Sequence, residues 1–111
     1  MKIIYKFILL TAIASFAHLQ VNAQEKTEEF KVYGNCSMCE KRIEKAVLSL
    51  EGVKTADWDK DTKMLNVNYD QAKLSVDDIH NKVAGAGHDT EKVKAPDEAY
   101  NQLPSCCKYR D

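Results

Sequence analysis

The sequence predicts an α+β fold in which an antiparallel sheet carries two helices on one face. Short segments whose apolar residues alternate, as in strands, are interrupted by two segments whose apolar residues recur with the period of a helix. The order along residues 24–95 is strand, helix, strand, strand, helix, strand. This order is typical of the split β-α-β arrangement, so we expect a ferredoxin-like βαββαβ sandwich.

The first strand and the first helix are expected to meet at two cysteines. The strand is expected around Phe30 and Val32, which fall on one face. After Cys39, four apolar residues form one helical stripe with the spacing i, i+3, i+4 and i+7: Ile43, Ala46, Val47 and Leu50. Gly52 is expected to end this helix. Cys36 and Cys39 therefore lie at a strand–helix junction.

Two strands joined by a polar hairpin turn are expected next, at "VKTADWD" and "KMLNVNYD". In the second of them, apolar residues alternate with asparagines: Leu65, Val67 and Tyr69. Trp58 and Tyr69 are expected in the core or on a face of the sheet.

A second helix is expected to begin at Ser75, which forms a capping box with Asp78 three residues later. Its inward residues are Val76, Ile79 and Val83. His80 lies next to this stripe and is expected at its boundary. The segment "GAGH" ends the helix. The final strand is expected at "DTEKVK", placed by the order of the preceding elements and not by its own alternation.

Residues 1–23 have the features of a cleaved signal peptide. Lys2 and Lys6 precede the apolar segment "FILLTAIASFA", and an A-x-A-like cleavage site ends at Ala23. An uncleaved membrane anchor is the alternative, but the apolar segment is short for the ~20 residues that a spanning helix needs. We therefore expect a periplasmic or otherwise exported protein.

The charge of the chain argues against nucleic acid as a partner. The formal net charge is -1, or -3 once the two lysines of the signal peptide are lost, and no basic block is present. Phosphate backbones are bound mainly by clustered Lys and Arg. No nucleophile with a base and an orienting partner can be assembled, and no phosphate-binding glycine loop is present. We therefore expect a binding protein and not an enzyme.

All four cysteines follow the signal peptide, and Cys36 and Cys39 form a CxxC motif. Export permits disulfides. At a strand–helix junction, however, the exposed N–H groups of the first helical turn lower the pKa values of nearby thiols. Such thiolates serve either disulfide exchange or the binding of a soft ion such as Cu(I). A structural disulfide is the third alternative, disfavoured because closing so short a loop removes little entropy.

From about Phe30 to Val93 the chain resembles the heavy-metal-associated domain family, which includes copper chaperones, modules of copper-transporting P-type ATPases and periplasmic mercury-binding proteins. The resemblance rests on four segments: "GNCSMC", "RIEKAVLSLEGV", "NVNYD" and "SVDDIHNKVAGAGH". It implies that Cys36 and Cys39 bind a soft ion in a near-linear or three-coordinate thiolate site. Cu(I) is the ion expected first, with Hg(II), Ag(I) or Zn(II) as alternatives.

Two features depart from the family pattern or extend it. The family usually has a methionine shortly before the first cysteine, packed under the metal loop, whereas this chain has Gly34 and Asn35 there and Met38 between the cysteines. His88 stands where family members often carry an aromatic residue and sometimes a histidine. The resemblance implies that His88 is a third ligand or screens the charge of the site. The alternative is a solvated loop histidine.

Residues 96–111 form a C-terminal tail that follows the region resembling a heavy-metal-associated domain and that such a domain alone lacks. Pro96 is expected to begin a short helix and Pro104 to end it, before the vicinal pair Cys106 and Cys107. The segment is long enough to return to the metal loop, since an extended chain covers up to ~3.3 Å per residue. The tail thiols are expected to cap the clamp formed by the thiol pair of Cys36 and Cys39, or to join two molecules through the ion. The alternatives are solvent-exposed thiols or a strained vicinal disulfide.

We expect an exported soft-metal-binding protein that sequesters Cu(I), or Hg(II), or hands it over by thiolate exchange. The expected partners are the metal ion, a metal-transporting ATPase or another metal-trafficking protein, and a second copy of the chain bridged by metal. A thiol–disulfide redox protein is the first alternative, although a thioredoxin-like enzyme would need a longer βαβ framework around its CxxC. An accessory interaction module with structural cysteines is the second.

Overall fold

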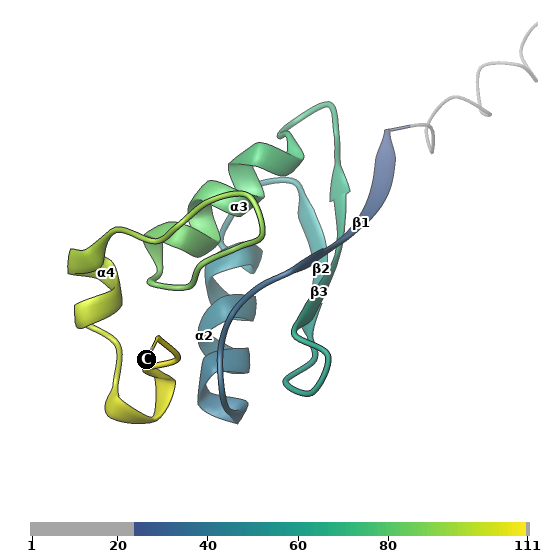
Figure 1. Cartoon of the computed structure of the whole chain (residues 1–111). Coiled ribbons are helices and arrows are strands. Elements are labelled where there is room, and N and C mark those ends of the chain that lie inside the picture. Colours follow the sequence, from purple (N-terminus) through teal and green to yellow (C-terminus); the bar gives the residue numbers. More distant parts are fainter. Residues whose placement is uncertain (1–23, 111) are drawn as a thin grey trace, which may run out of the picture.

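The computed structural model describes residues 24–110, which form a small sheet covered on one face by two helices (Figure 1). In chain order the elements are β1 (Glu25–Lys31), α2 (Ser37–Leu48), β2 (Val53–Trp58), β3 (Met64–Asp70), α3 (Val76–Gly85), α4 (Asp97–Asn101) and the 3-10 turn η1 (Ser105–Cys107). The expected signal peptide lies outside the described residues. Within the part that is described, no helix has the length and apolar character needed to cross a membrane.

The sheet is antiparallel, with the strand order β1-β3-β2. Leu65 in the central strand lies opposite Phe30 of β1 on one side and Trp58 of β2 on the other. Facing residues in neighbouring strands point to the same side of a sheet, so these three side chains form one apolar surface. The strand order and the placement of both helices on one face confirm the expected α+β, ferredoxin-like fold.

The prediction of a final strand at "DTEKVK" was wrong. Within the described chain, this segment forms only an isolated bridge between Thr90 and Val32. The side-chain hydroxyl of Thr90 accepts the backbone N–H groups of Lys92 and Val93 at 3.2 and 2.9 Å. The N–H of Thr90 also donates to the carbonyl of Val93 at 2.8 Å. These local bonds turn the chain where a strand would continue, as threonine side chains commonly do.

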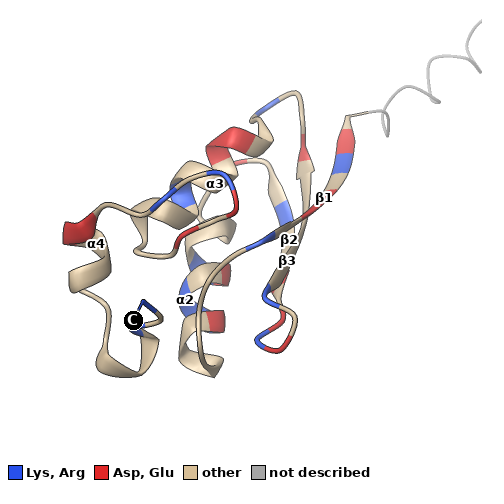
Figure 2. Cartoon of the chain, in the orientation of Figure 1, with Lys and Arg blue, Asp and Glu red and all other residues tan. Residues whose placement is uncertain are grey.

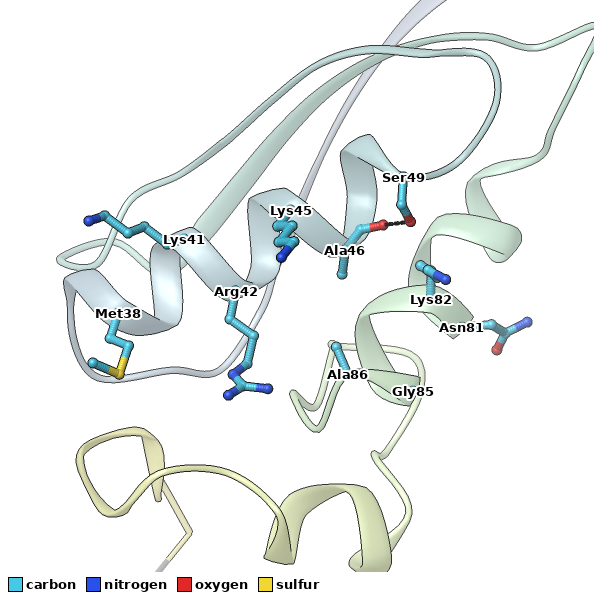
Figure 3. A pocket seen from close by; sticks show the side chains of 10 residues that line it. All are labelled: Met38, Lys41, Arg42, Lys45, Ala46, Ser49, Asn81, Lys82, Gly85 and Ala86. Atoms are coloured by element: carbon cyan, nitrogen blue, oxygen red, sulfur yellow. Dashed lines mark hydrogen bonds between the residues drawn. The ribbon is translucent and has the colours of Figure 1, made fainter.

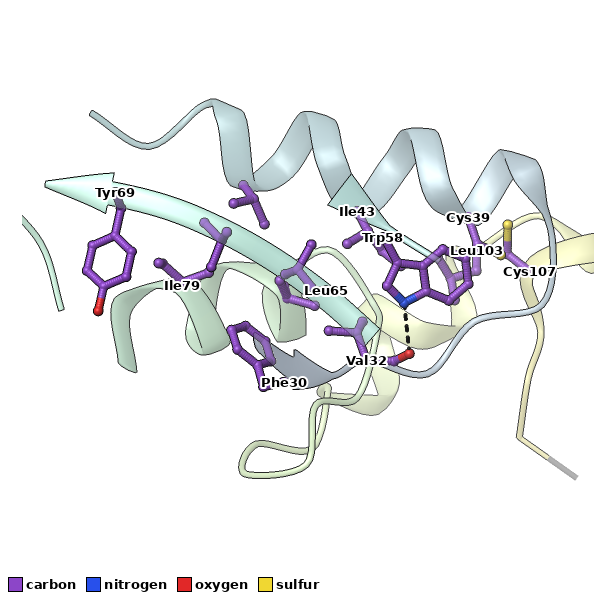
Figure 4. Packing of buried hydrophobic residues seen from close by; sticks show 13 residues of the cluster. Phe30, Val32, Cys39, Ile43, Trp58, Leu65, Tyr69, Ile79, Leu103 and Cys107 are labelled. Carbon is purple, nitrogen blue, oxygen red and sulfur yellow. Dashed lines mark hydrogen bonds between the residues drawn. The ribbon is translucent and has the colours of Figure 1, made fainter. Parts of the chain in front are cut away.

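The core lies between the sheet and the two helices (Figure 4). The helices contribute these residues of the apolar stripes expected from the sequence: Ile43 and Val47 from α2, and Ile79 and Val83 from α3. Leu50, beyond the end of α2, packs at the edge of the cluster, whereas Ala46 lines a groove between the helices. Trp58 and Tyr69 are buried, which confirms their expected place in the core. The Trp58 ring N–H donates to the carbonyl of Val32 at 3.0 Å (Figure 4), so the polar atom of this buried indole has a partner.

The ends of the two helices follow from particular residues. The expected capping box is present at α3, because the hydroxyl of Ser75 accepts the N–H of Asp78 and the Asp78 carboxylate accepts the N–H of Ser75. Helix α2 begins at Ser37, earlier than expected, with Cys36 as its N-cap residue. Gly52 follows the end of α2 with a φ of 100°, a conformation that other residues adopt at a cost.

His80 was expected at the boundary of the core, and this prediction was wrong. Its side chain is buried, and its ring stacks on Phe30 with a centroid distance of 3.8 Å. His80 Nδ1 lies 2.7 Å from the hydroxyl of Thr90, so the turn that replaces the final strand also supplies the polar partner of this histidine. Burial is the main cause that lowers the pKa of His80.

Charges of both signs are interspersed over the described chain. Figure 2 shows acidic and basic residues together on β1, on the hairpin between β2 and β3, and on helices α2 and α3. A concentration of basic side chains occurs in a groove between the two helices, described below.

Candidate metal centre

The structure brings the sulfur atoms of the CxxC motif and of the tail together, and all four cysteines are free thiols. Cys36 Sγ lies 3.5 Å from Cys39 Sγ and 3.9 Å from Cys107 Sγ. Cys106 Sγ lies 3.9 Å from Cys107 Sγ, and the sulfurs of Cys36, Cys106 and Cys107 all fall within 4.8 Å of one another. The expected return of the tail to the CxxC loop is therefore observed.

Helix α2 positions Cys36 where its thiol is activated. Cys36 has extended backbone angles, and its carbonyl accepts the N–H of Glu40 at the start of the helix. The Cys36 side chain makes no capping hydrogen bond, and Cys36 precedes the first turn of α2, whose N–H groups lack partners within the helix. The hydrogen bond from the Cys39 backbone is the main cause that lowers the pKa of Cys36 to about 7, against the opposite effect of burial. A large share of thiolate, the form that binds metal, is therefore present at neutral pH.

Cys39 lies at the inner side of the clamp and is fully buried. Its sulfur accepts the backbone N–H of Asn35 at 3.4 Å. A Cβ atom at Gly34 would lie 3.1 Å from Cys39 Cβ and 3.0 Å from the Trp58 ring, so the loop rests directly on the indole. The side chain of Met38 is 51% exposed and does not pack under the loop. Trp58 fills that place, a role that the sequence motif did not reveal.

The tail folds back over the end of the domain through α4 and η1 (Figure 1). Leu103 is buried and packs on Gly87, whose φ of 106° and lack of a Cβ allow the close approach. Cys107 is fully buried, whereas Cys106 is exposed. Burial is the main cause that raises the pKa of Cys107, and the neighbouring Cys39 is the second.

Hydrogen bonds and an ion pair fix the tail beside the metal loop. The side-chain amide of Asn35 donates to the carbonyl of Lys108 at 3.0 Å. The hydroxyl of Tyr109 donates to the carbonyl of Gly87 at 2.8 Å and accepts the N–H of Asp89 at 2.7 Å. The guanidinium of Arg110 binds both carboxylate oxygens of Asp89, at 2.7 and 3.3 Å. The tail is therefore held by contacts that do not involve sulfur.

His88 lies behind the loop and is fully buried, so it is not the solvated histidine of the alternative interpretation. Its Nδ1 lies 2.7 Å from the carbonyl of Tyr33, and its ring stacks on Tyr109 at 5.5 Å. Burial is the main cause that lowers the pKa of His88, which favours neutral imidazole. Its Nε2 has no hydrogen-bond partner among residues 24–110. The group of clustered thiols does not include His88, and ligation by this residue stays a prediction.

An open groove of about 710 Å³ lies between α2 and α3 (Figure 3). Four of the side chains that line it are basic: Lys41, Arg42, Lys45 and Lys82. Met38 lies at one end of the groove (Figure 3), and its sulfur is 3.6 Å from Cys106 Sγ. The groove is therefore a basic surface that reaches the thiol cluster.

Known proteins are similar to this domain in sequence and in structure. Residues 30–89 match the heavy-metal-associated domain family. The chain is 30% identical over 57 residues to the copper chaperone CopZ of Staphylococcus haemolyticus (strain JCSC1435), across 51% of this chain and 84% of that protein. The solved structure of oxidized MerP from Ralstonia metallidurans CH34 has a TM-score of 0.58 and 32% identity, covering 60% of this chain and 94% of MerP.

A third similar structure is the N-terminal domain of a potential copper-translocating P-type ATPase from Bacillus subtilis in the Cu(I)-loaded state. It has a TM-score of 0.57 and 30% identity, and the similarity covers 60% of this chain and 84% of that one. The family match includes the end of β1, the strands β2 and β3, the helices α2 and α3 and the CxxC loop, and it ends at residue 89. The tail with Cys106 and Cys107 lies outside it.

Proposed function

This chain belongs to the heavy-metal-associated domain family, and from that membership we propose that it is an exported carrier of Cu(I) that binds the ion through Cys36 and Cys39. Its relatives include a copper chaperone and a domain of a potential copper-translocating ATPase. The ion is cargo in this proposal, and the protein acts as a carrier and not as an enzyme.

The observation that supports the proposal most strongly is the pair of free thiols at the start of α2. Cys36 and Cys39 have sulfurs 3.5 Å apart, and the pKa of Cys36 is lowered to about 7, chiefly by the Cys39 backbone N–H. Cu(I) prefers soft thiolate ligands, and a partly ionised pair is ready to bind it at neutral pH. Binding releases the remaining thiol protons to solvent.

Anaerobic titration of the reduced protein with Cu(I), in competition with a chromophoric chelator, tests this function. We expect tight stoichiometric binding that is lost in the Cys36→Ser/Cys39→Ser variant. Ser37→Ala is the matched control, because it alters a residue between the two cysteines without removing a thiol. Binding by the double cysteine variant equal to that of the wild type would refute the proposal.

Hg(II) is the second candidate ion, because one similar structure is MerP. Two thiolates accept Cu(I), Ag(I) or Hg(II), and Zn(II) is accepted with added ligands. Native mass spectrometry of the reduced protein with Cu(I), Hg(II) and Zn(II) in competition ranks these ions. We expect the Cu(I) complex to dominate, and a dominant Zn(II) complex would contradict a soft-metal carrier.

Delivery is proposed to proceed by thiolate exchange, with a metal-transporting ATPase or another metal-trafficking protein as acceptor. Cys36 is only partly buried, so an incoming thiolate can reach an ion bound there. The basic groove beside Met38 would favour an acceptor with an acidic surface. The rate of Cu(I) loss to dithiothreitol is expected to rise with the dithiol concentration. A rate independent of that concentration would mean that the ion leaves by simple dissociation.

Export is proposed from residues 1–23, whose pattern is that of a signal peptide. Cell fractionation and N-terminal sequencing of the product expressed from the full chain test this point. We expect an exported protein that begins at Gln24. A cytoplasmic product that retains residues 1–23 would contradict it.

A further inference from the structure

We propose that Cys107 in the C-terminal tail supplies a third thiolate ligand to the ion held by Cys36 and Cys39. This inference rests on the proposed function and adds a ligand to the same site. The family match ends at residue 89, so the resemblance assigns no role to the tail cysteines. The argument rests on the positions of the sulfur atoms, on the difference between Cys106 and Cys107, and on the contacts that hold the tail.

The sulfur positions suit a three-coordinate ion. Cys36 Sγ lies 3.5 Å from Cys39 Sγ and 3.9 Å from Cys107 Sγ, so Cys36 is close to both of the other sulfurs. Metal–sulfur bonds of about 2.3 Å place three sulfurs of a trigonal site about 4 Å from one another. Both separations from Cys36 are already close to this value.

The two tail cysteines differ in direction and exposure. Cys107 is fully buried, and it belongs to the same buried cluster as Cys39. Cys106 is exposed, and its thiol donates to the Met38 sulfur at 3.6 Å. A buried cysteine can also pack simply as a small apolar residue. The contact of Cys107 with Cys36, at 3.9 Å between the two sulfurs, distinguishes a ligand position from mere packing.

The tail holds Cys107 in place before any ion arrives. Arg110 binds Asp89 through two hydrogen bonds, and Tyr109 binds the backbone on both sides of His88. Asn35, next to the clamp, donates to the carbonyl of Lys108. A ligand side chain that is already ordered loses little entropy when it binds the ion. Most of the free energy of the metal–sulfur bond therefore contributes to the affinity. A two-thiolate clamp thereby becomes a closed three-thiolate site.

X-ray absorption spectroscopy of the Cu(I)-loaded wild-type protein tests the ligand number directly and needs no mutation. We expect three sulfur ligands per copper ion. A spectrum that requires only two sulfurs would overturn the proposal. Because Cys107 is buried, this measurement also remains decisive if a variant at that position folds poorly.

Substitution then identifies the third sulfur, with Cu(I) affinity measured by chelator competition. Even an outer-shell partner of a metal site is commonly worth about 10–100-fold in affinity, so Cys107→Ser is expected to weaken binding at least about tenfold. Cys106→Ser is the matched control, since it removes the neighbouring thiol, and its affinity is expected to equal that of the wild type. Circular dichroism checks that both variants are folded.

The outcomes separate this inference from the proposed function. If Cys107→Ser is folded and binds as the wild type does, while Cys36→Ser/Cys39→Ser loses binding, the third ligand is refuted and the carrier function stands. Equal losses in Cys106→Ser and Cys107→Ser would also refute the assignment to Cys107. If Cys36→Ser/Cys39→Ser binds normally, the proposed function itself fails.

Discussion

At the scale of single residues, the loop before Cys36 packs on the ring of Trp58. Gly34 leaves room for this contact, because a Cβ there would lie 3.0 Å from the indole and 3.1 Å from Cys39 Cβ. The indole is itself fixed by its hydrogen bond to Val32. The position of Cys39 thus depends on a residue of β2 that is distant in the sequence.

Gly34→Ala is expected to destabilise the protein by about 1–2 kcal/mol, because the added methyl group must displace the Trp58 ring or the loop. Urea unfolding of the metal-free protein measures the effect. Gly85→Ala is the control, since a Cβ at that helical position meets nothing within 4 Å and is expected to stabilise by about 0.5–1 kcal/mol. An unchanged stability of Gly34→Ala would show that the loop does not rest on the indole.

Cys36 is expected to react with iodoacetamide at lower pH than an ordinary cysteine. Its pKa is lowered to about 7, first by the Cys39 backbone N–H, so the reactive thiolate increases as the pH rises through 7 and declines below it. Peptide mapping of the alkylated protein gives the rate at Cys36 against pH. An inflection near the ordinary cysteine value, about 8.5, would contradict this assignment.

At the scale of elements, local patterns predicted most of the fold. The alternation in β3, the stripe on α2 and the capping box at Ser75 each act within a few residues, so the sequence displays them. The final strand could not be predicted in this way, because the turn at Thr90 depends on one side chain and not on periodicity. Similarly, His80 is buried because Phe30 and Thr90 meet it from elsewhere in the chain.

For the site, the motif predicted Cys36 and Cys39 as ligands, which stays a prediction, and the sequence left the place of the tail open. Its docking depends on the pairing of Arg110 with Asp89, residues 21 positions apart. It also depends on the contact between Asn35 and Lys108, which are 73 positions apart. Such pairings leave no periodic signal. They become visible only when the fold brings these segments side by side.

Arg110→Ala is expected to release the tail while leaving the domain folded. Arg110 and Asp89 are both mostly buried, and hydrogen bonds to charged groups of this kind contribute about 2 kcal/mol. Hydrogen exchange is expected to become faster in α4 and η1, and Cys107 is expected to become open to alkylation. Lys94→Ala removes a positive charge from an exposed position nearby and serves as the control. Unchanged exchange in Arg110→Ala would show that the ion pair does not hold the tail.

At the scale of the whole molecule, the proposed third ligand implies that the tail decides whether an ion closes a site within one chain or joins two chains. Both possibilities use the same thiols, since the exposed Cys106 and the partly buried Cys36 can be reached from outside. In the docked state, however, Cys107 is already beside the clamp. Its effective concentration there is on the order of millimolar or more, as for a short tether. A second molecule must compete with this internal ligand.

The copper-loaded wild type is therefore expected to remain monomeric at about 10 µM, far below the effective concentration of the internal thiol. In Arg110→Ala the undocked tail loses this advantage, so the copper-loaded variant is expected to show a dimer fraction that grows with protein concentration. Size-exclusion chromatography with light scattering, with and without Cu(I), measures both, and Lys94→Ala should behave as the wild type. A copper-loaded wild type that is already dimeric at this concentration would mean that the tail serves a neighbouring molecule, because an internally closed site already uses Cys36, Cys39 and Cys107.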